Sequence, residues 1–190
     1  MMGSAARSPS GDGQTRPVHV VQGEFYVTAD PSVVLTTILG SCVAACICDP
    51  VAQVGGMNHF LLPGDTDRSQ GGDSLRYGVY SMELLINGLL RLGAQRHRLE
   101  GKLFGGGRML QGLTDVGFLN AAFAERFLKD EGISNVGGSL RGDRGRRIQF
   151  WPTHGRARQI FMEKAEQTVF QTERRAPAPV VDHDDSVELF

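Results

Sequence analysis

The sequence lacks a strong net charge, a long apolar run and any cysteine outside one short segment. Its 190 residues carry 20 basic and 21 acidic side chains, so a formal charge of -1 provides no overall basic field for binding nucleic acid. No uninterrupted apolar run is long enough to cross a bilayer, and we expect no membrane insertion. The hydrophobic fraction of 41% predicts instead one soluble domain with an ordinary core.

All three cysteines lie between Cys42 and Cys48. An oxidised, secreted chain usually spreads an even number of cysteines over distant segments, and the start of this chain, Met1–Ser4, has no apolar signal-peptide core. We therefore expect a cytoplasmic, reducing location. In that compartment a cysteine cluster indicates a metal site, a nucleophile or small buried side chains.

The two ends differ in composition from the rest of the chain. Residues 1–16 are rich in Gly, Ser, Ala and Arg without a hydrophobic period, and residues 175–190 pass from alternating Ala and Pro to acidic side chains. We expect a disordered N-terminal tail over 1–16, one domain over 17–174 and a flexible acidic tail over 175–190. The acidic tail is interpreted as a solvated extension rather than as a docking element.

Short apolar segments rich in β-branched or small side chains predict buried strands over residues 33–38, 43–48 and 55–62. A further strand is predicted over 99–104 and ends at the glycine run 105–107, which we expect to form a loop because glycine weakens a strand. No Lys-Ser or Lys-Thr pair follows these glycines, so the run is a weak match to a phosphate cradle. We expect no cofactor.

Two helices are predicted from apolar residues three and four positions apart. The first carries Val79, Met82, Ile86 and Leu89. It ends near Gly93, and the second helix begins after Thr114 or Asp115, either of which can cap it, and ends before Gly132. The buried face predicted for the second helix consists of Leu119, Ala122, Phe123 and Phe127.

Residues 147–151 and 158–161 flank Pro152–Gly155 and predict a β-hairpin, with a short helix expected over 163–172. Strands therefore occur in groups with helices between the groups. This order favours a mixed α/β (α+β) domain, with mixed sheets and flanking helices, over a doubly wound fold.

The turn Gly40-Ser41-Cys42 between the first two predicted strands is a candidate nucleophile site, because the sheet holds its backbone while the thiol is presented at the edge. A thiol needs a base to take its proton, and His59 on the third strand is the nearest candidate. Thr36 or Thr37 offers a hydroxyl or carbonyl to orient the imidazole. The backbone N–H groups of the turn are candidate donors to an oxyanion.

Two other interpretations of the cysteines stay open. The even spacing of Cys42, Cys46 and Cys48 also fits one packed face of a strand, which suits the last two because free cysteine is commonly buried. With His59 the three cysteines offer four zinc ligands, although alternate strand side chains lie too far apart to close a tetrahedron easily. Three other histidines, His97, His154 and His183, lie in polar or turn segments, and we interpret them as surface residues.

Motifs from residue 18 to residue 165 form one ordered set that leaves out both tails. They comprise 36–44 (TTILGSCVA), 49–50 (DP), 55–63 (GGMNHFLLP), 102–107 (KLFGGG), 136–138 (VGG), 146–150 (RRIQF) and 153–155 (THG). This set resembles the CheD family of bacterial chemotaxis proteins, the chemoreceptor glutamine deamidases. The resemblance implies a single domain whose active-site plan is similar to that of bacterial toxin deamidases.

The resemblance also implies an activity and a set of catalytic residues. It implies a cysteine amidohydrolase that converts glutamine side chains on chemoreceptor cytoplasmic helices to glutamate and releases ammonia. The nucleophile and base of the family fall on Cys42 and His59, and its active-site threonine falls on Thr36 rather than Thr37. Two positions depart from the family pattern, with Gly107 in place of a common alanine and Asn135 in place of a common acidic residue.

Other roles implied by the resemblance have structural alternatives. Gly105 and Gly106 would line the approach of a receptor helix, or form a tight structural turn. A basic cluster would steer an acidic receptor surface, or form a solvated hairpin face. Its members are Arg141, Arg144, Arg146, Arg147, Arg156 and Arg158. The alternative functions are a non-catalytic module that binds receptors or a CheC-type phosphatase, and a receptor glutamyl methylesterase.

Overall fold

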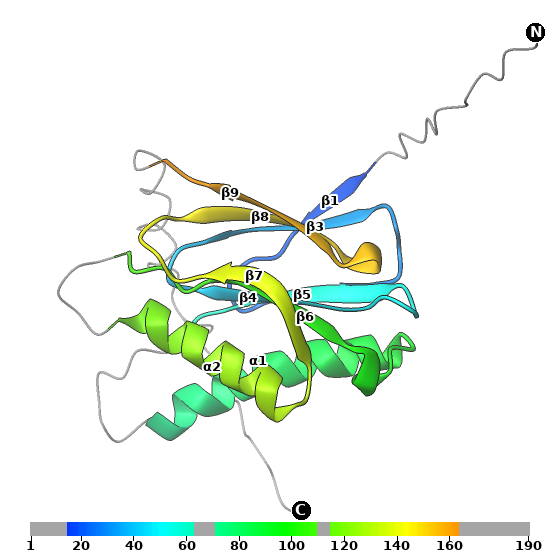
Figure 1. The fold of residues 1–190 in the computed structure, drawn as a ribbon, viewed down its shortest axis with the longest axis horizontal. Helices are drawn as coiled ribbons and strands as arrows, with labels where there is room; N and C mark the ends of the chain where they lie inside the picture. Colours follow the sequence, from blue (N-terminus) through cyan, green and yellow to red (C-terminus); the bar gives the residue numbers. More distant parts are fainter. Residues whose placement is uncertain (1–14, 63–70, 110–114, 164–190) are drawn as a thin grey trace, which may run out of the picture.

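Two β-sheets stack face to face, and two helices cover the outer face of one of them, which gives three layers (Figure 1). The computed structural model describes residues 15–62, 71–109 and 115–163. The mixed α/β architecture with flanking helices is therefore confirmed. Most of both predicted tails, residues 164–172 of the expected last helix, and Thr114 lie outside the described residues.

The first sheet has four strands in the order β1-β3-β8-β9. They are β1 (Arg16–His19), β3 (Val33–Leu39), β8 (Arg146–Trp151) and β9 (Arg156–Phe161). The β1 strand runs parallel to β3, and the other neighbours are antiparallel. The predicted hairpin is confirmed as β8 and β9, joined by the short 3-10 helix η2 (Pro152–His154).

The second sheet has five strands in the order β2-β5-β4-β6-β7. They are β2 (Phe25–Thr28), β5 (Val54–Phe60), β4 (Val43–Asp49), β6 (Glu100–Gly105) and β7 (Ser134–Leu140). Only the β6–β7 pair is parallel, so this sheet is mixed as well. The strands β1, β2 and β7 were not predicted, because the first two are short and β7 is largely exposed and interrupted by two glycines.

The helices α1 (Gly71–Arg91) and α2 (Val116–Asp130) pack on the second sheet, and the 3-10 helix η1 (Arg96–Arg98) follows α1. Asp115 caps α2, because its side chain accepts a hydrogen bond from the backbone N–H of Phe118. Phe123 and Phe127 are buried as predicted. The prediction for Leu119 is wrong, since 45% of this residue is exposed. The buried face of α2 instead includes Asn120, Ala121 and Ala124.

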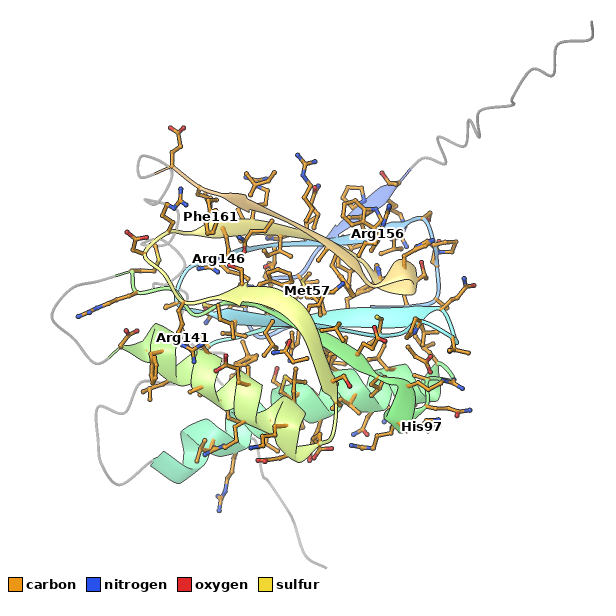
Figure 2. The ribbon with its side chains drawn as sticks, viewed as in Figure 1. Met57, His97, Arg141, Arg146, Arg156 and Phe161 are labelled. Carbon is orange, nitrogen blue, oxygen red and sulfur yellow. The ribbon has the colours of Figure 1, made fainter. Side chains whose placement is uncertain are left out.

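The central strand β4 separates two hydrophobic cores, and all seven of its residues are buried. One set of alternate side chains, which includes Ala44, Cys46 and Cys48, faces the first sheet, and Met57 of β5 lies there with them (Figure 2). The other set, Val43, Ala45 and Ile47, packs against the helices. A strand covered on both faces carries a continuous apolar sequence, and this explains why β4 shows no alternation.

A buried carboxylate fixes the far end of β4. Asp49 accepts three hydrogen bonds from Nε and Nη2 of Arg98, at N–O distances of 2.8–3.1 Å, and others from the backbone N–H groups of Val51, Ala52 and Gln95. Burial alone would raise the pKa of Asp49, but these donors outweigh it and hold the pKa well below its usual range. The contact therefore ties the turn after β4 to the segment that follows α1.

We expect Asp49→Asn to lower the free energy of unfolding by about 3 kcal/mol, because it removes one partner of a buried ion pair. Urea unfolding followed by circular dichroism measures this change. Because folding lowers the pKa of Asp49, its contribution is present above about pH 4 and is lost as the pH falls further. The matched control is Asp30→Asn, whose exposed pair with Arg16 is screened by water and should contribute much less to the free energy of unfolding. Equal losses in the two variants would contradict the prediction.

Candidate active site

The thiol of Cys42 and the imidazole of His59 lie on the same face of the second sheet. In the antiparallel β4–β5 pair, His59 is directly opposite Ala44. Cys42 lies just before β4, and its side chain packs in the same hydrophobic cluster as that of Ala44. That side faces the first sheet, because Cys42 and Ala44 both belong to the inter-sheet core.

Thr37 of β3 joins the first sheet to the imidazole. Its hydroxyl oxygen lies 2.9 Å from Nδ1 of His59, and the hydroxyl donates a hydrogen bond to the carbonyl of Val20 at 2.8 Å. Because the one hydroxyl proton is given to Val20, the oxygen accepts the Nδ1–H of His59. Nε2 then carries the lone pair of the neutral ring, which is the form that can receive a proton.

Burial keeps His59 neutral. The residue is 1% exposed, and burial is the main reason that its pKa is lowered to about 4. The Val20 carbonyl, 3.3 Å from Nδ1, raises the pKa by a smaller amount. Within the part of the chain that the structure describes, Nε2 has no hydrogen-bond partner. A buried polar atom without a partner is costly, and such atoms are typical of functional sites.

The placement of Thr36 differs from the one that the resemblance implied. Its hydroxyl lies 3.4 Å from Nδ1 of His19, on the side of β3 that faces away from His59. Successive strand residues point to opposite faces, so Thr37 shares the inner face with Leu35 and Leu39, and Thr36 cannot. The expected contact of Thr36 with the imidazole is therefore wrong, and Thr37 makes it.

Gln22 and Tyr77 also lie at the thiol, and sequence reasoning missed both. Cys42 is 7% exposed, and its Sγ donates a hydrogen bond to Oε1 of Gln22 at 3.2 Å. Burial and, to a smaller extent, the nearby Cys42 raise the pKa of the Tyr77 hydroxyl. Gln22 lies between β1 and β2, and Tyr77 lies on α1, so neither belongs to the motif around the nucleophile and no local signal marks them.

Three hydrogen bonds hold the carbonyl groups of the turn Gly40-Ser41-Cys42, which we call the nucleophile turn after the proposed role of Cys42. The carbonyl of Gly40 accepts from the N–H of Gly107 at 2.8 Å, and that of Cys42 accepts from the N–H of Gly106 at 2.7 Å. The carbonyl of Ser41 accepts from Nδ2 of Asn120 at 3.0 Å. With its carbonyls engaged behind it, the turn is fixed in position under the thiol.

The glycine run supports this turn from the inside of the molecule. A Cβ on Gly105 would lie 2.1 Å from the carbonyl oxygen of Cys42, and one on Gly106 would lie 2.8 Å from the carbonyl oxygen of Gly117. Both glycines are buried and have positive φ values, of 107° and 65°. The close approach that glycine permits is therefore to the chain's own backbone, which is the structural alternative, rather than to a receptor helix.

Cys46 and Cys48 are buried in the inter-sheet core, as predicted for packing residues. Burial strongly raises the pKa of the Cys46 thiol and raises that of Cys48 to about 11. Both thiols are therefore protonated and poor nucleophiles at neutral pH. Among the described residues, no group of three His, Cys, Asp or Glu side chains is placed to hold a metal ion.

The basic cluster is divided among three environments. Arg146 is buried and donates to the carbonyls of Ser139 and Arg141, close to the ring of Phe161 (Figure 2). Arg141 pairs with Glu125, and Arg144 stacks on Phe161 with 4.2 Å between its Cζ and the ring centroid. The other three members, Arg147, Arg156 and Arg158, are exposed.

Fold and site together define a two-sheet α/β domain that holds a thiol, a neutral imidazole and a hydroxyl at one end of the sandwich. The chain belongs to the CheD family. Residues 61–159 match the family model described as "CheD chemotactic sensory transduction". This match begins just after His59, so the thiol and the imidazole lie outside the matched residues.

Full-length relatives extend the similarity to the whole chain. The chain is 58% identical over 193 residues to a protein of Acidiphilium cryptum, with 98% of both chains covered. It is 56% identical to a protein of Caulobacter sp., with 95% of this chain and 94% of the relative covered. Both are named "Probable chemoreceptor glutamine deamidase CheD".

A solved Neisseria meningitidis protein of family-model DUF152 is similar over 67% of this chain and 64% of that chain. The TM-score is 0.45 and the identity 15%, a similarity too low to inform the fold or the site. Over the described residues, no helix has the length and apolar character needed to cross a membrane.

The lowered pKa of His59 gives a measurable expectation. In an NMR titration, its carbon-bound ring protons should change with a midpoint near pH 4 instead of near 6.5, with His59→Gln used to assign the signals. Because the unfolded chain takes up this proton near pH 6.5, the free energy of unfolding should fall as the pH is lowered from about 6.5 towards 4. A midpoint at or above 6.5 would contradict a buried neutral imidazole.

Proposed function

We propose that this chain is a chemoreceptor glutamine deamidase in which Cys42 is the nucleophile, His59 is the general base and acid, and Thr37 orients His59. The observation that carries the proposal is the bond between Thr37 and Nδ1 of His59, which leaves the lone pair of Nε2 on the side of the sheet where Cys42 lies. The names of the full-length relatives supply the substrate, a glutamine side chain of a chemoreceptor.

The reaction begins when Nε2 of His59 takes the thiol proton of Cys42. The thiolate attacks the carboxamide carbon of the substrate glutamine, and a tetrahedral intermediate with a negatively charged oxygen forms. His59 then gives its proton to the departing ammonia, and the C–N bond breaks to leave a thioester. A water molecule, deprotonated by His59, opens the thioester to glutamate and restores the thiol.

The charge on the tetrahedral oxygen requires donors that are already in place. We assign this role to the N–H groups of Gly40-Ser41-Cys42, because the carbonyls of this turn are engaged behind it and hold its backbone still. Gly105 and Gly106 contribute indirectly by allowing the loop behind the turn to approach it. Preorganised donors are valuable here because an amide is a weak electrophile.

From the family resemblance we also propose that a CheC-type phosphatase binds the chain. We propose further that the chain works in the cytoplasm, where the helices of its receptor substrate lie.

Replacing Cys42 or His59 with Ala should abolish the conversion of glutamine to glutamate on a receptor cytoplasmic fragment, because each change removes a group that forms or breaks a bond. Mass spectrometry of the fragment and ammonia release measure the reaction. Cys48→Ala is the matched control and should keep activity while reducing stability, since this thiol only packs. Activity that survives Cys42→Ala would overturn the nucleophile assignment.

A receptor fragment that carries glutamyl methyl esters tests the alternative methylesterase function, by showing whether esters are hydrolysed faster than amides.

Thr37→Val should lower kcat with little change in KM, by about 10- to 100-fold if the loss matches that seen when the partner orienting a metal-bound histidine is removed. Thr37→Ser restores the hydroxyl and should recover most of the activity. Thr36→Val should stay within about twofold of the unaltered chain, because the Thr36 hydroxyl lies near His19 on the side of β3 that faces away from His59. A larger loss in Thr36→Val than in Thr37→Val would return the orienting role to Thr36.

A further inference from the structure

The chain places one of its own glutamine side chains on the candidate nucleophile. Oε1 of Gln22 accepts a hydrogen bond from Sγ of Cys42 at 3.2 Å. Gln22 is an exposed residue between β1 and β2, twenty positions before Cys42. The group in contact with the thiol is thus a primary carboxamide, the same group that the proposed reaction hydrolyses.

The segment that carries Gln22 is hydrogen-bonded to β5, the strand that carries His59. The N–H of Gly23 donates to the carbonyl of His59 at 2.7 Å, and the N–H of His59 donates to the carbonyl of Glu24 at 3.0 Å. A turn bond from Glu24 N–H to the carbonyl of Val21, at 3.1 Å, closes the segment. Because its backbone is tied to β5, the Gln22 side chain is tethered beside the thiol rather than placed there by chance.

The contact is close to a reactive geometry. A C=O bond is about 1.23 Å long, so Cδ of Gln22 lies no more than about 4.4 Å from Sγ. A near-attack arrangement needs about 3 to 3.5 Å between the reacting atoms. Rotation about the side-chain bonds of an exposed glutamine supplies this difference without any movement of the tethered backbone, and such rotations are fast. Tethering also replaces a bimolecular encounter with an intramolecular one.

We infer that Gln22 is a self-deamidation site, which Cys42 of the same chain converts to glutamate; this inference rests on the proposed function. The thiolate attacks Cδ of Gln22 and a C–S bond forms. The C–N bond breaks, and the nitrogen leaves as ammonia with the proton from His59. Water then hydrolyses the thioester, so that residue 22 becomes glutamate and the thiol of Cys42 is restored.

The product would change the site that made it. A carboxylate at position 22 would lie beside Cys42, where its charge disfavours the thiolate. Gln22→Glu reproduces this product and should lower kcat/KM on a receptor fragment about tenfold relative to Gln22→Ala, which brings no charge. Self-deamidation therefore lowers kcat/KM on the receptor gradually, as residue 22 is converted to glutamate.

The test is peptide mapping by mass spectrometry of the full-length chain during incubation at neutral pH. In the unaltered chain, the peptide with Gln22 should gain the mass difference between glutamine and glutamate, at a first-order rate independent of protein concentration. Cys42→Ala should keep Gln22 as an amide. Gln53 is an internal control, because it is an exposed glutamine in the turn at the opposite end of the β4–β5 hairpin.

A receptor cytoplasmic fragment in a parallel sample separates the two levels of the hypothesis. Gln22 that stays an amide in a preparation that deamidates the fragment completely would overturn self-deamidation and leave the proposed function standing. Failure of both reactions in the unaltered chain would count against the proposed function itself. Conversion of Gln22 in Cys42→Ala, or conversion of Gln53 at the same rate, would show spontaneous chemistry and overturn the inference.

Discussion

The bond between Thr37 and Nδ1 of His59 is the contact on which the candidate site depends. It joins the two sheets, since Thr37 lies on β3 of the first and His59 on β5 of the second. Val20, just past the end of β1, completes it by accepting the hydroxyl proton. This arrangement decides which nitrogen of the ring carries its proton, and burial between the sheets keeps the ring neutral. The stacking of two sheets thus produces a neutral imidazole whose Nε2 lone pair suits it to the proposed role of base.

The thiol itself is positioned by backbone rather than by side chains. The loop after β6 and the side chain of Asn120 bind all three carbonyls of the nucleophile turn, and this requires glycine at the points of closest approach. The site therefore has a rigid wall on the β6 side. On the other side it is bordered by Gln22 and by Tyr77, which reach it from separate segments. Both of these residues are exposed, unlike the buried glycines behind the turn.

Backbone hydrogen bonds also explain how the chain holds the side chain of Gln22 beside Cys42, the proposed nucleophile. The backbone of His59 is hydrogen-bonded to Gly23 and Glu24, so the segment that carries Gln22 is held beside the histidine. In the proposed reaction, a receptor glutamine that reaches Cys42 would have to displace this side chain. Elsewhere the fold depends on ordinary hydrophobic packing. The ion pair of Asp49 and Arg98 fixes the end of β4 that lies away from the site.

The strands β3 to β6, the hairpin of β8 and β9, both helices and the candidate pair of Cys42 and His59 were predicted from the sequence, because apolar runs, turn residues and side-chain chemistry are local properties. The choice between Thr36 and Thr37 did not. Segment 33–39 is apolar on both of its faces, so its pattern shows that the two threonines point to opposite sides but not which side meets the histidine. Only the stacking of the sheets decided that point. It also brought Gln22 and Tyr77 to the thiol, since contacts between distant segments leave no periodic trace in the chain.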